Sequence, residues 1–323
     1  MKESLQILDN IRLNFNPDGL LVLNITLALI MFGVALEIKL KNFRDIFLMP
    51  KPFFTGFFSQ FLMLPLFTFL LVVLLNRWIT PTIAMGMILV AACPGGNVSN
   101  FISSLAKGNV ALSVTLTATA TLSALVLTPL NFALYGSLYV KFISITNSDQ
   151  LLQPLTIPLG QVFQTVFILL GIPLFLGMLV NWKFPRFTKM MMKPIRIFSI
   201  ISFTAMVVLA FINNYEYFWA NIKYIFLLVL VQNSMAFLTG YLFSLSFKLN
   251  RQNCRTISIE TGIQNSGLAL VLLFNPKIFP PELAIGGMAF IAAWWGIWHI
   301  LAGLGIASLW SYRKITAPAL KTT

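Results

Sequence analysis

The 323-residue chain has few charged residues, only two cysteines and a single histidine. Charged side chains make up 10% of it, against about a quarter in soluble globular domains, so a soluble globule is excluded. Cys93 and Cys254 do not suggest a disulfide framework or a cysteine-ligated metal site. The N-terminal stretch lacks the charged start, apolar centre and small-residue cleavage site of a secretory signal. The composition, 58% hydrophobic, is that of an integral membrane protein.

Apolar stretches of roughly 20 residues, the length that crosses a bilayer, recur along the chain. We predict an all-α polytopic membrane protein with nine transmembrane helices, so the two ends lie on opposite sides of the membrane. A single transmembrane domain over 18–309 then follows an N-terminal segment, 1–17, and precedes a tail, 310–323. The predicted spans are 18–37, 52–75, 82–106, 109–135, 157–181, 196–213, 223–247, 256–274 and 284–309.

Basic residues collect in alternate loops of this arrangement. Lys and Arg in short loops are retained on the cytoplasmic side. Sixteen of the 22 fall on one face, so we expect the N-terminus outside and the C-terminus in the cytoplasm. The net charge of +13 is therefore attributed to topology, and no nucleic-acid partner is expected. The sixteen are Lys39, Lys41, Arg44, Lys51, Lys107, Lys183, Arg186, Lys189, Lys193, Arg196, Lys248, Arg251, Arg255, Arg313, Lys314 and Lys321.

Two of the predicted spans contain residues that interrupt a membrane helix. In CPGGNVSN, residues 93–100, Pro94 removes a backbone donor and Gly95–Gly96 lets the chain leave helical geometry. In SIETGIQNSGLAL, residues 258–270, two glycines flank the polar run Gln264–Ser266. Helices are broken at membrane depth only where the freed backbone groups find partners. Two such breaks at corresponding positions of two halves indicate the midplane binding site of a transporter.

Glu260 is the one acidic residue of nine that we place within a span rather than in a loop, a tail or at a span end. A carboxylate at that depth is costly unless it has a partner, and the candidates are a proton or a bound metal cation. A protonated Glu260 hydrogen-bonded to a neighbouring helix is the simpler alternative. Unwound carbonyls suit a cation and exposed helix N-termini suit an anion, so broken helices can serve both charges.

Hydroxyl and amide side chains near the breaks offer the oxygen ligands that sodium needs. Ser113 and Thr117 are four residues apart and share one helix face directly after the first break, and Thr121 continues the stripe. Such hydroxyls commonly bond back to their own helix or pack against a neighbour, so only their placement favours a ligand role. Gln60 is a further candidate, although a lone buried glutamine also fits an interhelical hydrogen bond.

Several stretches of the sequence together resemble the bile acid:sodium symporter family, and the resemblance covers nearly the whole chain. They are MFGVALEIKLKNF at 31–43, Gln60 before MLP, CPGGNVSN followed by LAKGNVALSVTLTATATL, IETGIQNSGLA at 259–269 and Trp298–His299.

The resemblance implies a core domain with two crossed, discontinuous helices and a panel domain that moves against it in alternating access. The panel would contain the helices at about 18–37, 157–181 and 196–213, and the core those at about 52–135 and 223–309. The family is built from inverted repeats, and this chain resembles its nine-span members, in which the first helix of repeat one is missing. We expect it to function as a monomer in the inner (plasma) membrane.

Members of the family couple the entry of an organic anion to two sodium ions. Carried over by motif, the first sodium would be held by Ser99, Asn100, Ser113, Thr117 and Glu260. The second would use Gln60, Gln264, a Glu260 oxygen and the main-chain carbonyls of Thr261 and Ile263.

On the substrate side, the resemblance points to the main-chain donors of Asn97 and Val98, to Asn265 and to His299. Relatives place this histidine beside the substrate cavity, yet they often follow it with Asn where this chain has Ile300. A lone histidine in an apolar helix is also commonly structural. The cargo would be a bile acid or a smaller carboxylate such as pantoate.

Two other classes remain open at this stage. A proton-coupled or metalloid carrier would use Glu260 as a proton site or Cys93 as a soft ligand. A channel or sensor would use the broken helices as a pore or a ligand seat. An enzyme is not expected, because Glu260, His299 and the cysteines form no nucleophile–base pattern.

Overall fold

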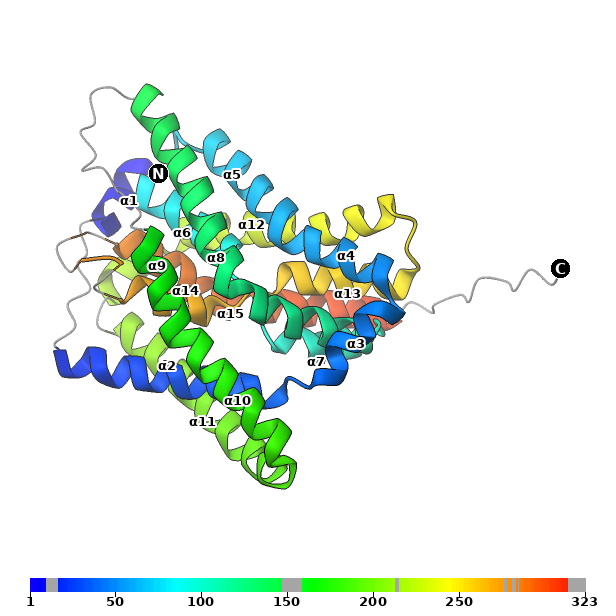
Figure 1. Ribbon diagram of the computed structural model, residues 1–323. Helices are drawn as coiled ribbons and strands as arrows, with labels where there is room; N and C mark the ends of the chain where they lie inside the picture. Colours follow the sequence, from blue (N-terminus) through cyan, green and yellow to red (C-terminus); the bar gives the residue numbers. More distant parts are fainter. Residues whose placement is uncertain are drawn as a thin grey trace.

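The computed structural model describes residues 1–9, 17–146, 159–212, 215–275, 278–280, 283 and 285–312, which Figure 1 draws in colour. These residues lie mostly in helices and contain no strand, as the all-α prediction requires. The helices are α1 (Lys2–Asp9), α2 (Pro17–Glu37), α3 (Leu40–Leu48), α4 (Pro50–Phe58), α5 (Leu64–Leu74), α6 (Pro81–Ala92), α7 (Val98–Leu105), α8 (Val110–Thr146), α9 (Leu159–Val166), α10 (Ile172–Lys183), α11 (Pro185–Ile212), α12 (Tyr215–Ser246), α13 (Arg251–Gly262), α14 (Ser266–Leu273) and α15 (Gly286–Tyr312), with π-helical turns η1 (Ser59–Met63) and η2 (Phe167–Gly171).

Five continuous helical stretches of the described chain are long and apolar enough to cross a bilayer. They support a multi-pass membrane protein, whereas the count of nine spans and the inverted repeats stay predictions. The five are Pro50–Leu74, Val110–Thr146, Gly160–Lys183, Asn221–Ser246 and Gly286–Tyr312.

Helical structure extends past several of the predicted boundaries. The predicted loop between the first two spans forms α3, which packs on α8. α11 begins at Pro185 instead of residue 196, because proline suits the first helical turn and basic residues at a membrane surface do not end a helix. α8 continues to Thr146 and α15 to Tyr312, beyond the predicted ends at 135 and 309. Arg12, Lys277 and the tail residues from Arg313 onward lie outside the described residues.

The three helices expected to form a panel pack on one another. α2 contacts both α10 and α11, and Figure 1 shows the three together along the lower side of the molecule. Gly177 allows the close approach of α10 to α2, since a Cβ there would lie 2.5 Å from the Cβ of Ala35. Whether this group moves as a domain stays a prediction.

Gln60 lies in a π-helical turn within the helix formed by α4, η1 and α5. Pro65 follows this turn and has no N–H, so it cannot donate to the carbonyl four residues earlier, that of Phe61. Asn131 of α8 donates its Nδ2 to that carbonyl at 2.9 Å. The bulge is thus satisfied by a neighbouring helix, and single π-turns within α-helices are frequent at functional positions.

Two sharp turns have the same construction. Two residues beyond the last helical residue of α7 and of α12 stands a lysine with φ of 55°, Lys107 and Lys248. In both turns the next residue donates its N–H back to a helix carbonyl, at 2.8 Å from Gly108 and 3.2 Å from Leu249. An asparagine then caps the following helix, Asn109 for α8 and Asn250 for α13. These turns fix where α8 and α13 begin.

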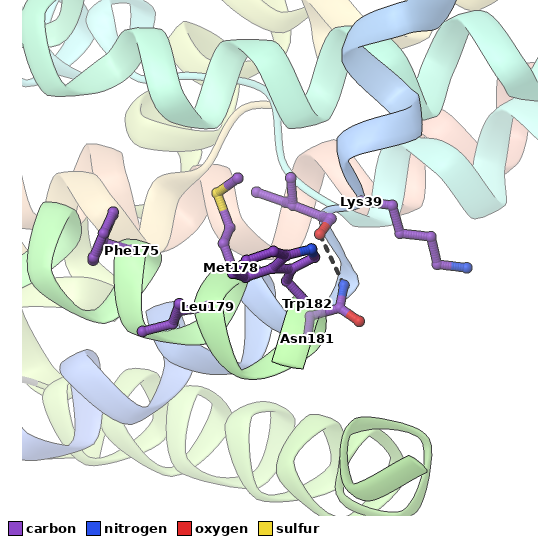
Figure 2. Close-up of a pocket in the computed structure, with 7 residues that line it drawn as sticks. Lys39, Phe175, Met178, Leu179, Asn181 and Trp182 are labelled. Atoms are coloured by element: carbon purple, nitrogen blue, oxygen red, sulfur yellow. Dashed lines mark hydrogen bonds between the residues drawn. The ribbon is translucent and has the colours of Figure 1, made fainter. Parts of the chain in front are cut away.

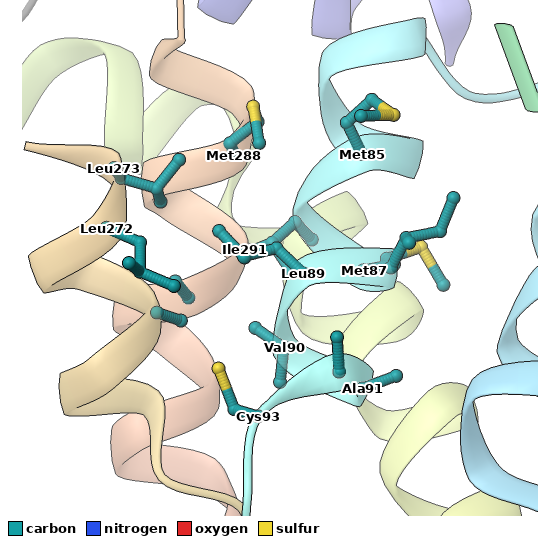
Figure 3. Packing of buried hydrophobic residues seen from close by; sticks show 14 of the residues in the cluster. Met85, Met87, Leu89, Val90, Ala91, Cys93, Leu272, Leu273, Met288 and Ile291 are labelled. Atoms are coloured by element: carbon teal, nitrogen blue, oxygen red, sulfur yellow. The ribbon is translucent and has the colours of Figure 1, made fainter. Parts of the chain in front are cut away.

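The apolar core brings α6, α14 and α15 together (Figure 3). Leu89, Leu272 and Ile291 are fully buried in it, one from each helix. Gly86 permits the contact between α6 and α15, because a Cβ there would lie 2.7 Å from the Cα of Met288. The half-helices on either side of the breaks are therefore held by close packing as well as by hydrogen bonds.

The N-terminal segment contains a short helix, α1, that the sequence did not lead us to expect. Its Leu5 and Leu8 are fully buried. Asp9 accepts hydrogen bonds from Thr80 Oγ1, at 2.9 Å, and from Thr82 Oγ1, at the start of α6. Burial raises the pKa of the Asp9 carboxyl, and the two hydroxyl donors oppose that rise.

Candidate functional site

The two helix breaks meet each other. The chain leaves α6 after Ala92 and re-enters a helix at Val98, and the second gap lies between Gly262 and Ser266. Gly96 N donates to Ile263 O at 2.9 Å, and Asn265 N donates to Pro94 O at 2.7 Å. Each unwound segment therefore supplies partners for the other, which is how a broken helix is tolerated at membrane depth.

Glu260 lies beside this junction, fully buried, near the end of α13. Ser99 Oγ donates to its Oε1 at 2.6 Å, and Ser113 Oγ donates to the same oxygen. Thr117 Oγ1 lies 3.0 Å from Oε2 and 3.2 Å from Oε1. Two helices, α7 and α8, thus direct hydroxyl side chains to the one carboxylate that α13 carries.

Asn100 completes this cluster from α7. Its Oδ1 lies 2.9 Å from Ser113 Oγ and 3.2 Å from Thr117 Oγ1. The cluster contains the two carboxylate oxygens, one amide oxygen and three hydroxyl oxygens, but each hydroxyl supplies only one hydrogen. The oxygens therefore outnumber the hydrogens. Ser113 and Thr117 each have several acceptors within reach but only one hydrogen to donate. Such an oxygen-rich, buried cluster suits a hard cation.

The carbonyl groups at the end of α13 contact the amides of two predicted ligands. Gln60 Nε2 donates to Glu260 O at 3.3 Å, and Gln264 Nε2 donates to Thr261 O at 2.7 Å. Ile263 O accepts from the first break. The side-chain oxygens Gln60 Oε1 and Gln264 Oε1 are buried and have no hydrogen-bond partner among the described residues. A buried oxygen without a donor is unfavourable, and a bound cation is one group that compensates it.

Gly95 brings the first break into direct contact with this cluster. A Cβ at Gly95 would lie 2.5 Å from Gln60 Nε2 and 3.2 Å from Glu260 Oε2. A side chain at this position would therefore displace Gln60 and crowd Glu260. The candidate residues of both ion sets, Ser99, Asn100, Ser113, Thr117, Glu260, Gln60, Thr261, Ile263 and Gln264, therefore lie at one junction of broken helices.

The candidate substrate residues are less closely associated. Asn97 and Val98 lie at the N-terminus of α7, where first-turn N–H groups have no partner in their own helix. Asn265 caps α14, accepting from Leu268 N at 3.1 Å through its Oδ1. His299 is buried on α15 with its ring 6.5 Å from that of Trp295. Within the described chain no hydrogen bond or ring contact joins His299 to the other three residues, so its role stays a prediction.

Two hydroxyl side chains that the sequence analysis did not name contact candidate ligand residues. Ser59 Oγ lies 2.9 Å from Thr261 Oγ1, and Ser103 Oγ lies 3.2 Å from Ser113 Oγ. Ser103 follows Ser99 by four residues on α7, so spacing along a helix could have found it, whereas the position of Ser59 next to Gln60 does not place the two on one helix face. Thr121, in contrast, donates to the Thr117 carbonyl of its own helix at 2.8 Å.

A cavity of about 330 Å³ lies apart from these residues, between the end of α2 and α10 (Figure 2). Asn181 Nδ2 donates to Ile38 O at 2.9 Å at its edge. None of the candidate site residues lines it. The lining residues are Ile38, Lys39, Phe175, Met178, Leu179, Asn181 and Trp182.

The apolar helices and the polar junction of two broken helices together define a multi-pass membrane protein of the transporter class. A sequence model described as the Sodium Bile acid symporter family matches residues 24–221. The chain belongs to this family, which confirms the resemblance found from its motifs.

Relatives come from bacteria, plants and animals. The chain is 30% identical over 291 residues to the uncharacterized sodium-dependent transporter YocS of Bacillus subtilis, covering 90% of this chain and 83% of that protein. It is 30% identical to the human ileal sodium/bile acid cotransporter, over 86% and 78% of the two chains. It is 33% identical to the probable chloroplastic sodium/metabolite cotransporter BASS1 of Arabidopsis thaliana, over 88% and 65%.

Proposed function

We propose that the protein is a sodium-coupled symporter that imports an organic anion by alternating access, and that it performs no enzymatic reaction. The observation that carries the proposal is the buried oxygen cluster around Glu260, where two broken helices meet. Membership of the sodium bile acid symporter family and the sodium-dependent relatives support the same coupling.

Two sodium ions would bind at this junction. Ser99, Asn100, Ser113, Thr117 and Glu260 would hold the first, and Gln60, Gln264, Glu260 and the carbonyls of Thr261 and Ile263 the second. Two sodium ions and one monovalent anion carry one net positive charge inward, which contributes about 2.3 kcal/mol per 100 mV of membrane potential. The N-terminus would lie outside, in keeping with the basic loops.

The organic anion would bind near the N-termini of α7 and α14. The backbone N–H groups of Asn97 and Val98 would donate to a carboxylate or sulfonate there, assisted by Asn265. The relatives' names point to bile acids and other metabolites as cargo classes, and a smaller carboxylate such as pantoate fits the same chemistry.

The metalloid-carrier alternative loses support. Cys93, its soft ligand, is fully buried among apolar side chains of α6 (Figure 3). The hydrogen bonds within the Glu260 cluster involve hydroxyl, amide and carboxylate oxygens, which are hard ligands.

Replacing sodium tests the proposal. A thermal-shift screen of carboxylates and sulfonates, with and without sodium, identifies a ligand, because a ligand stabilises the folded protein in proportion to its occupancy. We expect uptake of that ligand into proteoliposomes to collapse when external sodium is replaced by choline. Uptake that is unchanged in choline would overturn the proposal and favour a proton-coupled carrier, and flux that does not saturate would favour a channel.

Thr117→Val is expected to raise the sodium concentration for half-maximal uptake about tenfold, as loss of a ligand-orienting group commonly does. Valine keeps the shape of threonine but loses the hydroxyl that contacts both Glu260 oxygens. Thr121→Val is the matched control, because the Thr121 hydroxyl donates only to its own helix. Equal sodium curves for the two variants would contradict a ligand role for Thr117.

A further inference from the structure

The end of α13 presents three successive carbonyl groups that cannot be satisfied within the helix. The last four carbonyls of a helix lack intrahelical partners unless the chain turns back. Ile259 O accepts from Ile263 N at 2.9 Å. The next three carbonyls, of Glu260, Thr261 and Gly262, are each within hydrogen-bond distance of a side-chain amide.

The third of these amides belongs to Asn233 of α12, a residue that sequence reasoning did not single out. Asn233 Nδ2 donates to Gly262 O at 2.7 Å, against 3.3 Å for Gln60 to Glu260 O. Asn233 is fully buried. Its Oδ1, like Gln60 Oε1 and Gln264 Oε1, has no hydrogen-bond partner in the described part of the chain. Asn233 therefore has the same pattern of contacts as two candidate ligands of the second sodium.

α12 holds Asn233 against α13 with little room for adjustment. Phe237, four residues later on the same face, contacts Gly262 so closely that a Cβ on Gly262 would collide with its ring. Ser258 Oγ donates to Phe237 O at 2.7 Å. A Cβ on Gly240 would lie 2.6 Å from Ile257 O. This face of α12 thus fits closely against α13 from Ile257 to Gly262.

The geometry points to Asn233 as a positioning residue of the second sodium site. By holding the Gly262 carbonyl, Asn233 fixes the peptide unit that joins Gly262 to Ile263. The carbonyls of Thr261 and Ile263, on either side, are then held in the orientation in which they bind sodium. This inference rests on the proposed sodium-coupled function and adds a residue from a helix that the candidate ligand sets do not include.

Asn233→Leu tests the inference, because leucine has a similar size and no donor. We expect the sodium concentration for half-maximal uptake to rise about tenfold, the usual effect of losing a group that orients a metal ligand. The maximal rate at saturating sodium should fall much less. The stabilisation of the purified protein by sodium alone should shift to higher sodium concentrations by the same factor, which is a readout independent of transport.

Asn181→Leu is the matched control, since Asn181 Nδ2 also donates to a backbone carbonyl, that of Ile38, but away from the junction. Its sodium curve should be unchanged. If Asn233→Leu does not fold, Asn233→Ser serves instead, because its hydroxyl ends one bond short of the amide nitrogen and leaves the Gly262 carbonyl without its donor.

The outcomes separate the inference from the function on which it rests. A lower maximal rate with an unchanged sodium requirement, in whichever variant folds, would make Asn233 a packing residue and overturn the inference alone. An unaltered protein whose uptake and stability do not respond to sodium would overturn the proposed function and this inference together.

Discussion

Glu260→Ala should abolish sodium-dependent uptake while the protein still inserts into the membrane. Glu260 is the common acceptor for Ser99, Ser113 and Thr117, and its backbone carbonyl accepts from Gln60. Removing one partner of a buried charge pair costs about 3–5 kcal/mol, which corresponds to a loss of about two to three and a half orders of magnitude in sodium affinity. Uptake measured over a range of sodium concentrations checks this.

Two variants separate charge from shape in this experiment. Glu260→Gln keeps the size of the side chain but loses the negative charge, so it should also lose sodium dependence. Asp45→Asn removes a carboxylate on α3, outside the cluster, and should leave the sodium curve unchanged. Full sodium-dependent transport by Glu260→Ala would contradict the assignment of Glu260 as a sodium ligand.

Gly95→Ala should reduce sodium-dependent uptake by roughly fivefold to a hundredfold. The added Cβ would lie 2.5 Å from Gln60 Nε2 and 3.2 Å from Glu260 Oε2, so both candidate ion sites must shift. Overpacking of a close-packed interior costs about 1–3 kcal/mol, and that strain falls on the groups that would hold sodium. The effect should appear as a higher sodium requirement in uptake and in thermal stabilisation.

Gly305→Ala is the matched control for this substitution. Gly305 lies in α15, and a Cβ there meets no atom within 4 Å. Its alanine variant should transport normally and be as stable as the unaltered protein or more so, since alanine favours a helix. A Gly95→Ala variant that behaves like Gly305→Ala would show that the first break does not touch the ion sites.

Composition and motifs were enough to predict the class of fold and the meeting of the two breaks at one site. Pro94 and Gly95–Gly96 interrupt a helix, so the freed backbone groups need partners. Glu260, the one carboxylate that we place within a predicted span, needs a compensating group. Both constraints are local, so they can be read without knowing how the helices pack. The family resemblance, confirmed by the comparisons, then supplied the two ligand sets.

Features that depend on packing between distant helices could not be predicted. The contact of Asn233 with Gly262 requires α12 to lie against the end of α13, and the sequence NSMAFL contains no pattern that predicts this contact. The helix α1 is short and polar, and its order depends on burying Leu5 and Leu8 and on the contact of Asp9 with Thr80 and Thr82. The extension of α11 back to Pro185 was not predicted either, because its residues from 185 to 195 are mostly exposed and lack the apolar content of a span.

Direct binding of radioactive sodium to the purified protein, in the absence of any organic anion, tests the central claim most directly. We predict saturable binding that approaches two ions per chain, with negligible binding by Glu260→Ala at the same protein concentration. Equal sodium binding by the unaltered protein and Glu260→Ala would contradict the claim that sodium binds where the two broken helices meet.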